Sequence, residues 1–561
     1  MKNKKEKAMP KHETRGRDTA LCALIAAVTF ALTLYFGLYG CDPHHDGVMF
    51  EAALKVAHGA VLFRDTFTQY GALAVWYDAL FIRLFGDSMA SIQIAAAVGM
   101  AGCGVLLYTV GKKLTGRTMA LISALLAPAL SYMYFWHLHP WSSIPALFFQ
   151  LLACECMMQF EQDGKYYKLA LAGLCAALCA WCRLPVGLLA FMAGGGALVL
   201  VQIMRRRKTG EFVRGLLVYG IGFAAQLAVL VLPMVQNGTL DAWHGMVIVG
   251  TSNFAAETNT AGASTGFLVR LVWSLAGAWI KRNPLIDCIW LVLPAAACLC
   301  LLRIGVPVLS AYAKSPRSPH LPPCEQKEVW AVVLCVYAVG GWAQYYPVSD
   351  YRHWYWAALP MLPVLAYQLC RPAVRFAKLQ RLAALAAVVL LAGNVAVRGY
   401  FALASMGVLH YEKNPHETRP GITSFYMDEN WNRNDTAVFA DSRYPYLNGL
   451  RLSADTAAFY DQLYTVLDEL KEKYPEKNIY NRTAEGFLGV FQTEYIPYGN
   501  APYSDYTSIE NEYIRANKPV MITQSETDWQ GYTSDYKPYA VLCGNDGRVN
   551  ENTIYIMVAK C

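Results

Sequence analysis

The chain has 561 residues, of which 55% are hydrophobic and 16% charged, and its formal net charge is +7. This composition excludes a mainly soluble protein and predicts a polytopic membrane protein. The charge is divided unevenly, because residues 402–561 contain 14 Lys and Arg against 22 Asp and Glu, whereas the rest contains 34 against 19. A basic membrane part with an acidic tail reflects membrane orientation and gives no argument for a nucleic-acid partner.

The chain begins with a basic segment, residues 1–18, which is followed by an apolar run from Thr19 to Tyr39. The positive-inside rule places this basic segment in the cytoplasm. No small-residue cleavage site follows the run, so a signal anchor is favoured over a cleaved signal peptide. The next segment, the outer loop 40–89, is then expected on the outer face of the plasma (cytoplasmic) membrane.

Apolar runs long enough to cross a membrane recur as far as Phe401. The later basic loops all lie inside only if residues 70–85, which include Asp78 and Arg83, form an interfacial helix rather than a span. The membrane domain, 19–401, is thus predicted to contain about eleven transmembrane helices, near residues 19–39, 90–110, 118–136, 142–159, 167–182, 185–203, 213–235, 284–303, 328–345, 353–370 and 382–401. An odd number of crossings places the tail, 402–561, outside the cell.

Cysteines and glycines within the apolar runs are expected to serve packing. The tail has only Cys543 and Cys561, too few for a disulfide framework, and Cys179 and Cys182 form an isolated C-x-x-C at helical spacing. The run 194–196 consists of three glycines without a following Lys-Ser or Lys-Thr, so we expect close helix packing and not a phosphate loop.

The outer loop carries the most informative motif, Cys-Asp-Pro-His-His-Asp-Gly at residues 41–47. Apolar residues with helical spacing follow it from Phe50 to Ala57, which predicts an amphipathic helix along the membrane surface. Asp46 lies at the start of this helix, where a carboxylate is stabilised by the helix dipole. It is therefore either a helix cap or a catalytic carboxylate.

The order of the motifs resembles that of C-type membrane glycosyltransferases, in particular the family 39 group of protein mannosyltransferases and lipid A aminoarabinose transferases. The resemblance covers approximately residues 19–400 and includes an acidic residue before an amphipathic helix, followed by Arg64-Asp65-Thr66. The chain departs from the family where His45-Asp46-Gly47 replaces an acidic pair and where Tyr70-Gly71-Ala72 replaces Lys-Pro-Pro.

Three further segments extend the resemblance. Arg183 occupies the place of the family's cation at a Thr-Lys-Gly-Pro-type junction, where it either clamps a lipid phosphate or snorkels to the interface. Asp350, Arg352 and His353 belong to a late outer loop that contacts substrate or forms a structural network. His139 precedes a proline where relatives carry Asp-Pro, and it either contacts substrate or holds the loop.

The resemblance implies an inverting transfer of a sugar from a polyprenyl-phosphate donor to an extracytoplasmic glycan, lipid or protein acceptor of the cell envelope. Asp46 would be the general base, and cations would bind the donor phosphate. The donor-phosphate candidates are Arg183, Arg352, His353 and Arg64, and the substrate-site candidates are His45, His44, Asp65, His139 and Asp350.

No cofactor is expected. His44, His45 and Asp46 are conceivable metal ligands, but adjacent histidines point in different directions and no spaced partner is evident, so a divalent ion is not favoured.

The tail is predicted to be a soluble α/β domain, with strands near 437–440, 520–523, 539–542 and 553–558 and a helix over 454–473. We expect it to assist acceptor recognition. Two other functions stay open at this point: a noncatalytic cell-envelope scaffold or receptor, which would depend on the tail, and a lipid-linked-glycan transporter, which would place charges near the bilayer midplane.

Overall fold

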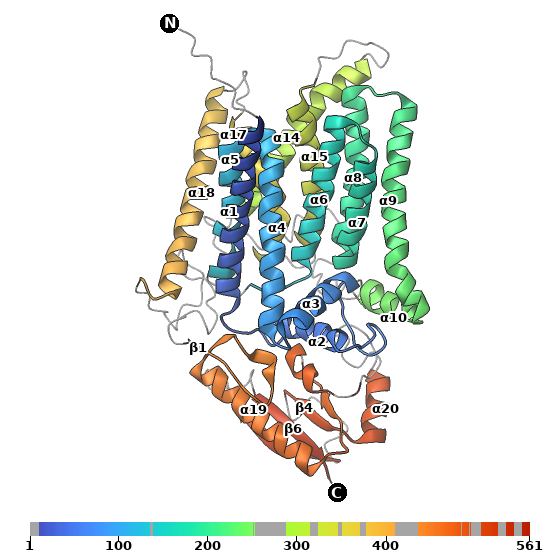
Figure 1. Cartoon of the computed structure of the whole chain (residues 1–561), viewed down its shortest axis with the longest axis vertical. Coiled ribbons are helices and arrows are strands. Elements are labelled where there is room, and N and C mark those ends of the chain that lie inside the picture. Colours follow the sequence, from blue (N-terminus) through green and yellow to red (C-terminus); the bar gives the residue numbers. More distant parts are fainter. Residues whose placement is uncertain are drawn as a thin grey trace.

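The computed structural model describes residues 11–134, 138–250, 252, 288–314, 324–345, 351–370, 377–409, 436–483, 485–492, 494, 507–524, 535–543 and 553–560. It consists of a helical bundle and a smaller α/β tail that lies against one end of the bundle (Figure 1). The first described helix, Lys11–Gly37, begins at the other end. A chain that enters the bundle at one end and leaves it at the other crosses it an odd number of times, which agrees with the prediction.

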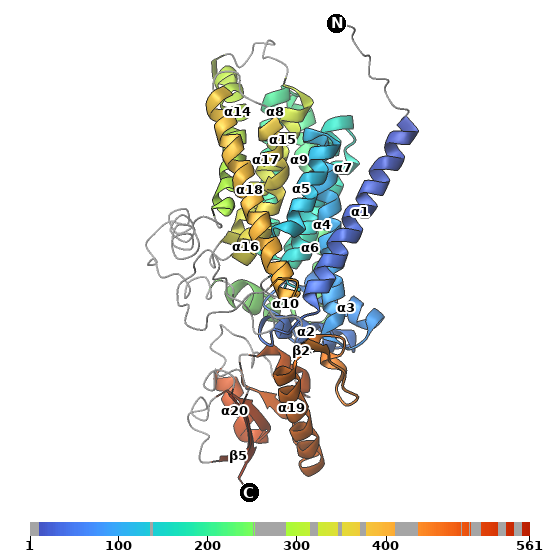
Figure 2. The same ribbon diagram turned by 90° about the vertical axis from the view of Figure 1, so that its left-hand side faces the viewer.

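In the described part of the chain, the helical segments that run along the bundle overlap the segments predicted to cross the membrane (Figure 1, Figure 2). They are α1 (Lys11–Gly37), α4 (Met89–Thr115), α5 (Arg117–Ala129), α6 (Ser143–Asp163), α7 (Tyr167–Cys182), α8 (Leu184–Arg205), α9 (Thr209–Gln236), α14 (Ile289–Lys314), α15 (Gln326–Gly340), α16 with α17 (Tyr351–Ala358, Leu362–Cys370) and α18 (Ala377–Ser405).

Seven of the described helices are long and apolar enough to span a membrane, so the chain is a multi-pass membrane protein. The other bundle helices are shorter, and the total of eleven crossings remains a prediction.

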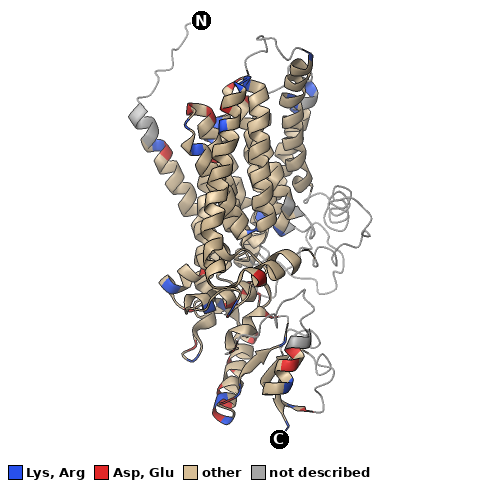
Figure 3. Cartoon of the chain, turned by 90° about the vertical axis from the view of Figure 1, so that its right-hand side faces the viewer, with Lys and Arg blue, Asp and Glu red and all other residues tan. Residues whose placement is uncertain are grey.

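Charged residues gather at the two ends of the bundle and leave its middle mostly free of them (Figure 3). At the amino-terminal end, Asp18 accepts hydrogen bonds from Lys112 Nζ and Arg117 Nε, both at 2.7 Å. Glu161 pairs there with Arg207. Basic loops that are neutralised by local carboxylates fit a membrane surface, whereas a transporter would place charges near the midplane.

Two short helices, α2 (His45–Ala57) and α3 (Ala72–Phe85), lie across the opposite end of the bundle, between the bundle and the tail (Figure 1). Residues 72–85 therefore form the helix that was predicted to lie at the interface. Arg83 ties the two helices together, because its guanidinium donates to the carbonyl of Ala57 at 2.8 Å and to that of Val56 at 3.2 Å. These carbonyls end α2 and have no partner within the helix.

Close backbone contact anchors the start of α3 to the junction of α7 and α8. Gly71 N–H donates to the carbonyl of Cys182 at 3.2 Å, and a Cβ on Gly71 would overlap the carbonyl of Trp181. Cys179 and Cys182 are buried and free, which confirms that they serve packing. The glycine run is confirmed as a packing site at Gly194, where a Cβ would overlap the hydroxyl groups of Tyr219 and Tyr337.

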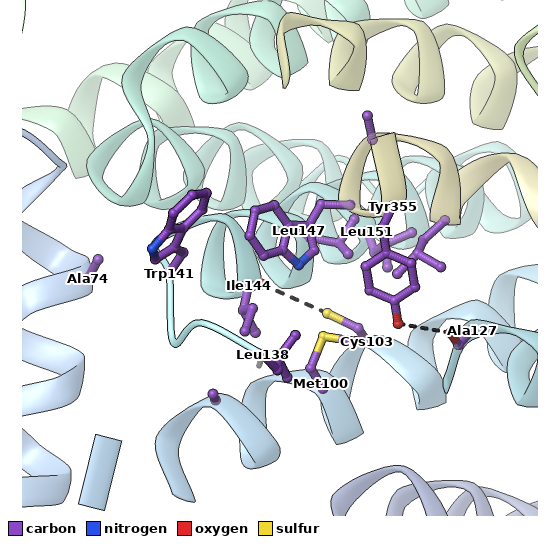
Figure 4. Packing of buried hydrophobic residues seen from close by; sticks show 14 of the residues in the cluster. Ala74, Met100, Cys103, Ala127, Leu138, Trp141, Ile144, Leu147, Leu151 and Tyr355 are labelled. Atoms are coloured by element: carbon purple, nitrogen blue, oxygen red, sulfur yellow. Dashed lines mark hydrogen bonds between the residues drawn. The ribbon is translucent and has the colours of Figure 1, made fainter. Parts of the chain in front are cut away.

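The hydrophobic core continues from the bundle toward its tail-facing end. Figure 4 shows Ile144 packed beside Met100 and Cys103 of α4. Tyr355 of α16 donates a hydrogen bond to the carbonyl of Ala127 at 2.8 Å. The chain before α6 is thus held by apolar contacts on several sides, which matters because this segment carries His139.

The tail has mixed α/β structure, and the strands and helix that the sequence predicts are present. A four-stranded sheet has the order β3-β4-β6-β5, in which β3 and β4 are parallel and the other pairs antiparallel. The sequence patterns missed β2, β3 and α20. The tail elements are β1 (Thr436–Val438), β2 (Arg451–Ser453), α19 (Ala454–Lys473), β3 (Ile479–Asn481), the 3-10 helix η8 (Gly486–Phe491), α20 (Thr507–Asn517), β4 (Val520–Thr523), β5 (Tyr536–Cys543) and β6 (Thr553–Ala559).

The tail docks directly on α2 through η8. Phe487 N–H donates to the carbonyl of Pro43 at 2.9 Å, and the Phe487 ring stacks on Phe50 at a centroid distance of 6.4 Å. Both phenylalanines are fully buried, and each such burial stabilises by about 1.5–3 kcal/mol. The backbones meet at two glycines, since a Cβ on Gly47 would overlap the backbone of Phe487 and one on Gly486 would overlap Val48.

The first prediction concerns this docking contact. We expect Gly47→Ala to destabilise the protein by about 1–3 kcal/mol, because the added methyl group overlaps backbone that has no flexible side chain to move away. The measurement is the thermal unfolding of the purified full chain, together with the rate at which a protease releases the tail.

The matched control is Gly195→Ala. No atom lies within 4 Å of a Cβ at this helical position, and alanine is a better helix former than glycine by about 1 kcal/mol. Equal thermal stability and equal tail release in the two variants would contradict the proposed importance of the contact.

Candidate active site

The start of α2 is capped by Asp42 and not by Asp46. Asp42 Oδ1 accepts hydrogen bonds from the backbone N–H groups of His44 and His45, at 3.0 and 2.8 Å. Asp42 Oδ2 lies 2.8 Å from His45 Nδ1. Burial raises the pKa of Asp42, but the hydrogen bonds from the side chain and the backbone of His45 outweigh it and hold that pKa well below its usual range. Asp46 is thereby left available for other contacts.

Asp46 forms a buried hydrogen bond with His139. Asp46 Oδ1 lies 2.8 Å from His139 Nδ1, and both side chains have 0% exposed surface. His139 Nε2 in turn lies 3.1 Å from Arg352 Nη1. Because a guanidinium only donates, Nε2 accepts, which makes His139 a neutral imidazole with its proton on Nδ1. That proton is donated to Asp46, whose Oδ2 also accepts from the N–H of Asp42 at 3.2 Å.

Aromatic rings surround this chain of hydrogen bonds. Trp141 stacks on His139 with an interplanar angle of 20°, and its ring also lies beside His45, with centroid distances of 5.2 Å in both cases. The Arg352 guanidinium lies over the Trp141 ring at 5.4 Å. The ring of His353 also lies beside Trp141, at a centroid distance of 5.5 Å. Trp141 therefore fixes the relative positions of the imidazole and the guanidinium.

Arg183 lies at the same end of the bundle, at the junction of α7 and α8, where it donates to the hydroxyl of Ser143. Ser143 begins α6, four residues after His139. The structure therefore brings Asp46, His45, His139, Arg352 and His353 together and places Arg183 near the same loop.

Other predicted residues lie elsewhere or outside the described part. Arg64 is exposed and pairs with Asp65 at 2.7 Å, and this pair has no described contact with the Asp46–His139 cluster. His44 is exposed beside His45, at a ring distance of 4.7 Å. Asp350 lies outside the described residues. The binding roles of these residues stay predictions.

Asp42, His45 and His139 form a group with metal-ligating chemistry, because one ligand atom of each lies within 4.8 Å of the others. The sequence did not predict that His139 would join Asp42 and His45 in such a group. However, His139 Nε2 already accepts from Arg352, so a divalent ion at this atom would have to displace a guanidinium cation. The carboxylate and the two imidazoles are suitable metal ligands, whereas the positive charge of Arg352 beside them disfavours a bound cation.

The exposed edge of the cluster is formed by Asp42 and His45, whose side chains are 24% and 32% exposed. Glu485 of the tail adjoins this edge, and its charge interacts with those of His44, Asp42 and His45. Burial raises the pKa of Glu485, partly offset by His44 and by the hydrogen bond from Gln524. The tail thus contributes a carboxyl group to the rim of the site.

Sequence reasoning missed Asp42, Trp141 and Glu485. The Asp-Pro pair at 42–43, directly before a predicted helix, is a signal that would have identified Asp42 as the capping residue. Trp141 and Glu485 have no comparable signal, because their importance depends on contacts with segments far away in the chain.

Residues 71–235 match the family model described as dolichyl-phosphate-mannose-protein mannosyltransferase. The match runs from α3 to α9 and includes His139 and Arg183. It confirms the predicted resemblance to the protein mannosyltransferase-like group of C-type membrane glycosyltransferases. This match supports glycosyltransferase activity for the membrane protein.

No curated protein matched the chain. Solved structures that resemble it include ArnT from Cupriavidus metallidurans, with 12% identity, a TM-score of 0.48 and coverage of 96% of this chain and 98% of that one. An oligosaccharyltransferase from Archaeoglobus fulgidus, in complex with Zn and sulfate, has 11% identity, a TM-score of 0.46 and coverage of 96% and 75%. Arabinosyltransferase EmbB from Mycobacterium smegmatis has 15% identity, a TM-score of 0.39 and coverage of 71% and 41%. With TM-scores below 0.5, these similarities carry no argument.

The second prediction uses the depressed pKa of Asp42. A carboxyl group with a depressed pKa contributes stability above its unfolded pKa of about 3.9, and this contribution is lost as the pH falls toward the folded pKa. We expect Asp42→Asn to cost about 1.5–3 kcal/mol at pH 7 through the lost charged hydrogen bonds. The difference in the free energy of unfolding between wild type and Asp42→Asn should narrow as the pH falls below about 4.

The measurement is the midpoint of thermal unfolding between pH 3 and 8. Glu476→Gln removes an exposed carboxylate of the tail and should leave the midpoint unchanged. A destabilisation by Asp42→Asn that is equal at pH 3 and pH 7 would show that the ionised carboxylate is not the cause.

Proposed function

We propose that the protein transfers a sugar from a polyprenyl-phosphate donor to an acceptor on the outer side of the membrane, with inversion at the anomeric carbon. The acceptor is a glycan, lipid or protein of the cell envelope. The observation that carries the proposal is the hydrogen-bonded chain Asp46–His139–Arg352, which joins a carboxylate to a cation at the bundle end that faces the tail. The family match through α3 to α9 supports the same chemistry.

Asp46 is the proposed general base. Asp46 Oδ1 accepts a hydrogen bond from Nδ1–H of His139 at 2.8 Å. Asp46 Oδ2 accepts a longer one, at 3.2 Å, from the backbone N–H of Asp42. An acceptor meets Asp42 and His45 first, since Asp46 and His139 are fully buried. Its nucleophilic oxygen or nitrogen would replace the weaker contact and lose its proton to Asp46 as it attacks the anomeric carbon.

Arg352 is the proposed partner of the leaving phosphate, with Arg183 as a second cation at the same end of the bundle. As the bond to the anomeric carbon breaks, negative charge accumulates on the lipid phosphate, and a guanidinium stabilises it through two N–H groups. The long apolar helices around this end suit a lipid-linked donor.

The tail is proposed to recognise the acceptor. Its η8 helix packs on α2, and Glu485 lies beside the exposed Asp42–His45 edge. An acceptor that approaches Asp46 would therefore contact the tail before it reaches the base. This arrangement is the reason for assigning the tail to the acceptor rather than to the donor.

The third prediction tests the base. Purified full-length protein is incubated with a panel of polyprenyl-phosphate sugars, and the donor that loses its sugar is identified by the polyprenyl phosphate released. With that donor, we expect Asp46→Asn to lower the rate by about 100-fold or more, because a positioned general base contributes about 10²–10⁴-fold.

Asp87→Asn is the matched control, since Asp87 lies after α3, where it contacts His58 away from the cluster. Normal transfer by folded Asp46→Asn would eliminate Asp46 as the base. No sugar release from any donor by folded wild-type protein would overturn the proposed function.

The fourth prediction separates phosphate stabilisation by Arg352 from metal catalysis. We expect transfer to be unaffected by a divalent-ion chelator, whereas Arg352→Gln should lower kcat by about 10²–10³-fold, as the loss of one charge-stabilising donor does elsewhere. The measurement is the initial rate with and without EDTA. Loss of activity in EDTA and its recovery with added Zn²⁺ or Mn²⁺ would favour a metal at Asp42, His45 and His139 instead.

A further inference from the structure

Asp78 is a buried carboxyl group that the proposed reaction does not use. It lies in the middle of α3, its exposed fraction is 4%, and it forms neither a hydrogen bond nor an ion pair with any residue in the described part of the chain. Burial raises the pKa of Asp78 well above its usual range. A carboxyl group without a charged partner is retained in such surroundings as the neutral acid.

Asp78 lines a small cavity between α3 and the segment that follows His139. One wall consists of Ala74, Tyr77 and Asp78, and the facing wall includes Pro140, Trp141 and Ser142. Figure 4 shows Ala74 and the Trp141 indole facing each other across this space. The volume of the cavity is about 10 Å³. The cavity is thus lined in part by the loop that follows His139 of the candidate active site.

Three polar groups in this cavity lack a protein partner. The indole Nε1 of Trp141 and the hydroxyl of Ser142 are buried and have no hydrogen-bond partner among the described residues. Asp78 is 4% exposed, and its carboxyl group likewise forms no hydrogen bond with a described residue. Buried polar groups are normally paired, and a cavity of about 10–15 Å³ accommodates one water molecule when two to four polar partners surround it. One water molecule would accept from the indole N–H and exchange hydrogen bonds with the acid and the hydroxyl.

We propose that Asp78 is a positioning residue of the candidate active site, which holds the Pro140–Ser142 segment in place through one buried water molecule. The proposal rests on the proposed function for its catalytic consequence, but the water site itself does not. Asp78 contacts no reacting atom; it acts through the loop.

The loop transmits the position of Trp141 to His139. The backbone N–H of Trp141 donates to the backbone carbonyl of His139 at 2.8 Å, and the rings of the two residues are stacked. Arg352 lies over the same indole. A shift of Trp141 toward an empty cavity would therefore move both the imidazole that holds Asp46 and the guanidinium assigned to the phosphate. Small misplacements of this kind cost up to about 100-fold in rate.

Two variants of nearly the same shape test the proposal. Asp78→Asn replaces a neutral acid by a neutral amide that still binds water, so we expect transfer within about threefold of wild type, well below the cost of a misplaced loop. Asp78→Leu removes the water partner, and we expect kcat to fall by about 10-fold or more while the KM for the donor is unchanged. Thermal stability should fall slightly in Asp78→Leu, because the indole N–H of Trp141 and the hydroxyl of Ser142 lose the water molecule that pairs them.

A readout independent of transfer keeps this test separate from the proposed function. Hydrogen exchange of peptides covering residues 138–145 should accelerate in Asp78→Leu but not in Asp78→Asn, and a high-resolution map of the full chain should show water density in wild type and Asp78→Asn only. Asp87→Leu, an exposed-loop control, should match wild type in both measurements.

Wild-type exchange and wild-type kcat in Asp78→Leu would overturn the proposal. Equal loss of activity in Asp78→Asn and Asp78→Leu would also overturn it, because the ionised carboxylate would then be required. If wild-type protein transfers no sugar, the proposed function fails, while the exchange and density measurements still decide whether Asp78 holds the loop.

Discussion

The buried hydrogen bond between Asp46 and His139 is the contact on which the rest of the site depends. A carboxylate with no exposed surface is costly unless each of its oxygens is satisfied. This requirement brings three distant segments to one point: the start of α2, the loop before α6, and α16 with Arg352. The orientation of the His139 ring, the identity of its protonated nitrogen and the position of Arg352 all follow from that one bond. A site assembled in this way is held by packing and not by the loop's own conformation.

The tail shares in this support. Because α2 lies between the bundle and η8, the helix that presents Asp46 is packed on both sides. Backbone contact at Gly47 and Gly486 leaves no room for a side chain between the two parts. The prediction of a separate accessory unit therefore understates the connection, since the tail also places Glu485 at the rim of the site. We infer that acceptor binding and the geometry of the base are linked through this shared helix.

Much of the membrane architecture could be predicted from composition and charge. Long apolar runs identify spanning helices because backbone polar groups must be satisfied within the helix in lipid. The short run at 70–85 is predicted to lie at the interface because Asp78 and Arg83 are costly to bury in a bilayer, and the structure shows it as a helix across the end of the bundle. In the tail, β2 and β3 were missed because each has only three residues and includes polar ones, whereas the equally short β1 overlaps the apolar run 437–440.

For the site, the sequence by itself determined that Asp46 follows the first apolar run and which family the order of the motifs resembles. It predicted that His139 and Arg352 occur in outer loops, whereas the structure places Arg352 in the helix α16. Those properties depend on local composition and on motif order. Only the tertiary structure decided that Asp46, His139 and Arg352 are in contact and that Arg64 pairs with Asp65 away from them. Contacts between side chains 93 and 213 residues apart arise from helix packing and burial, and neither has a periodic pattern along the chain.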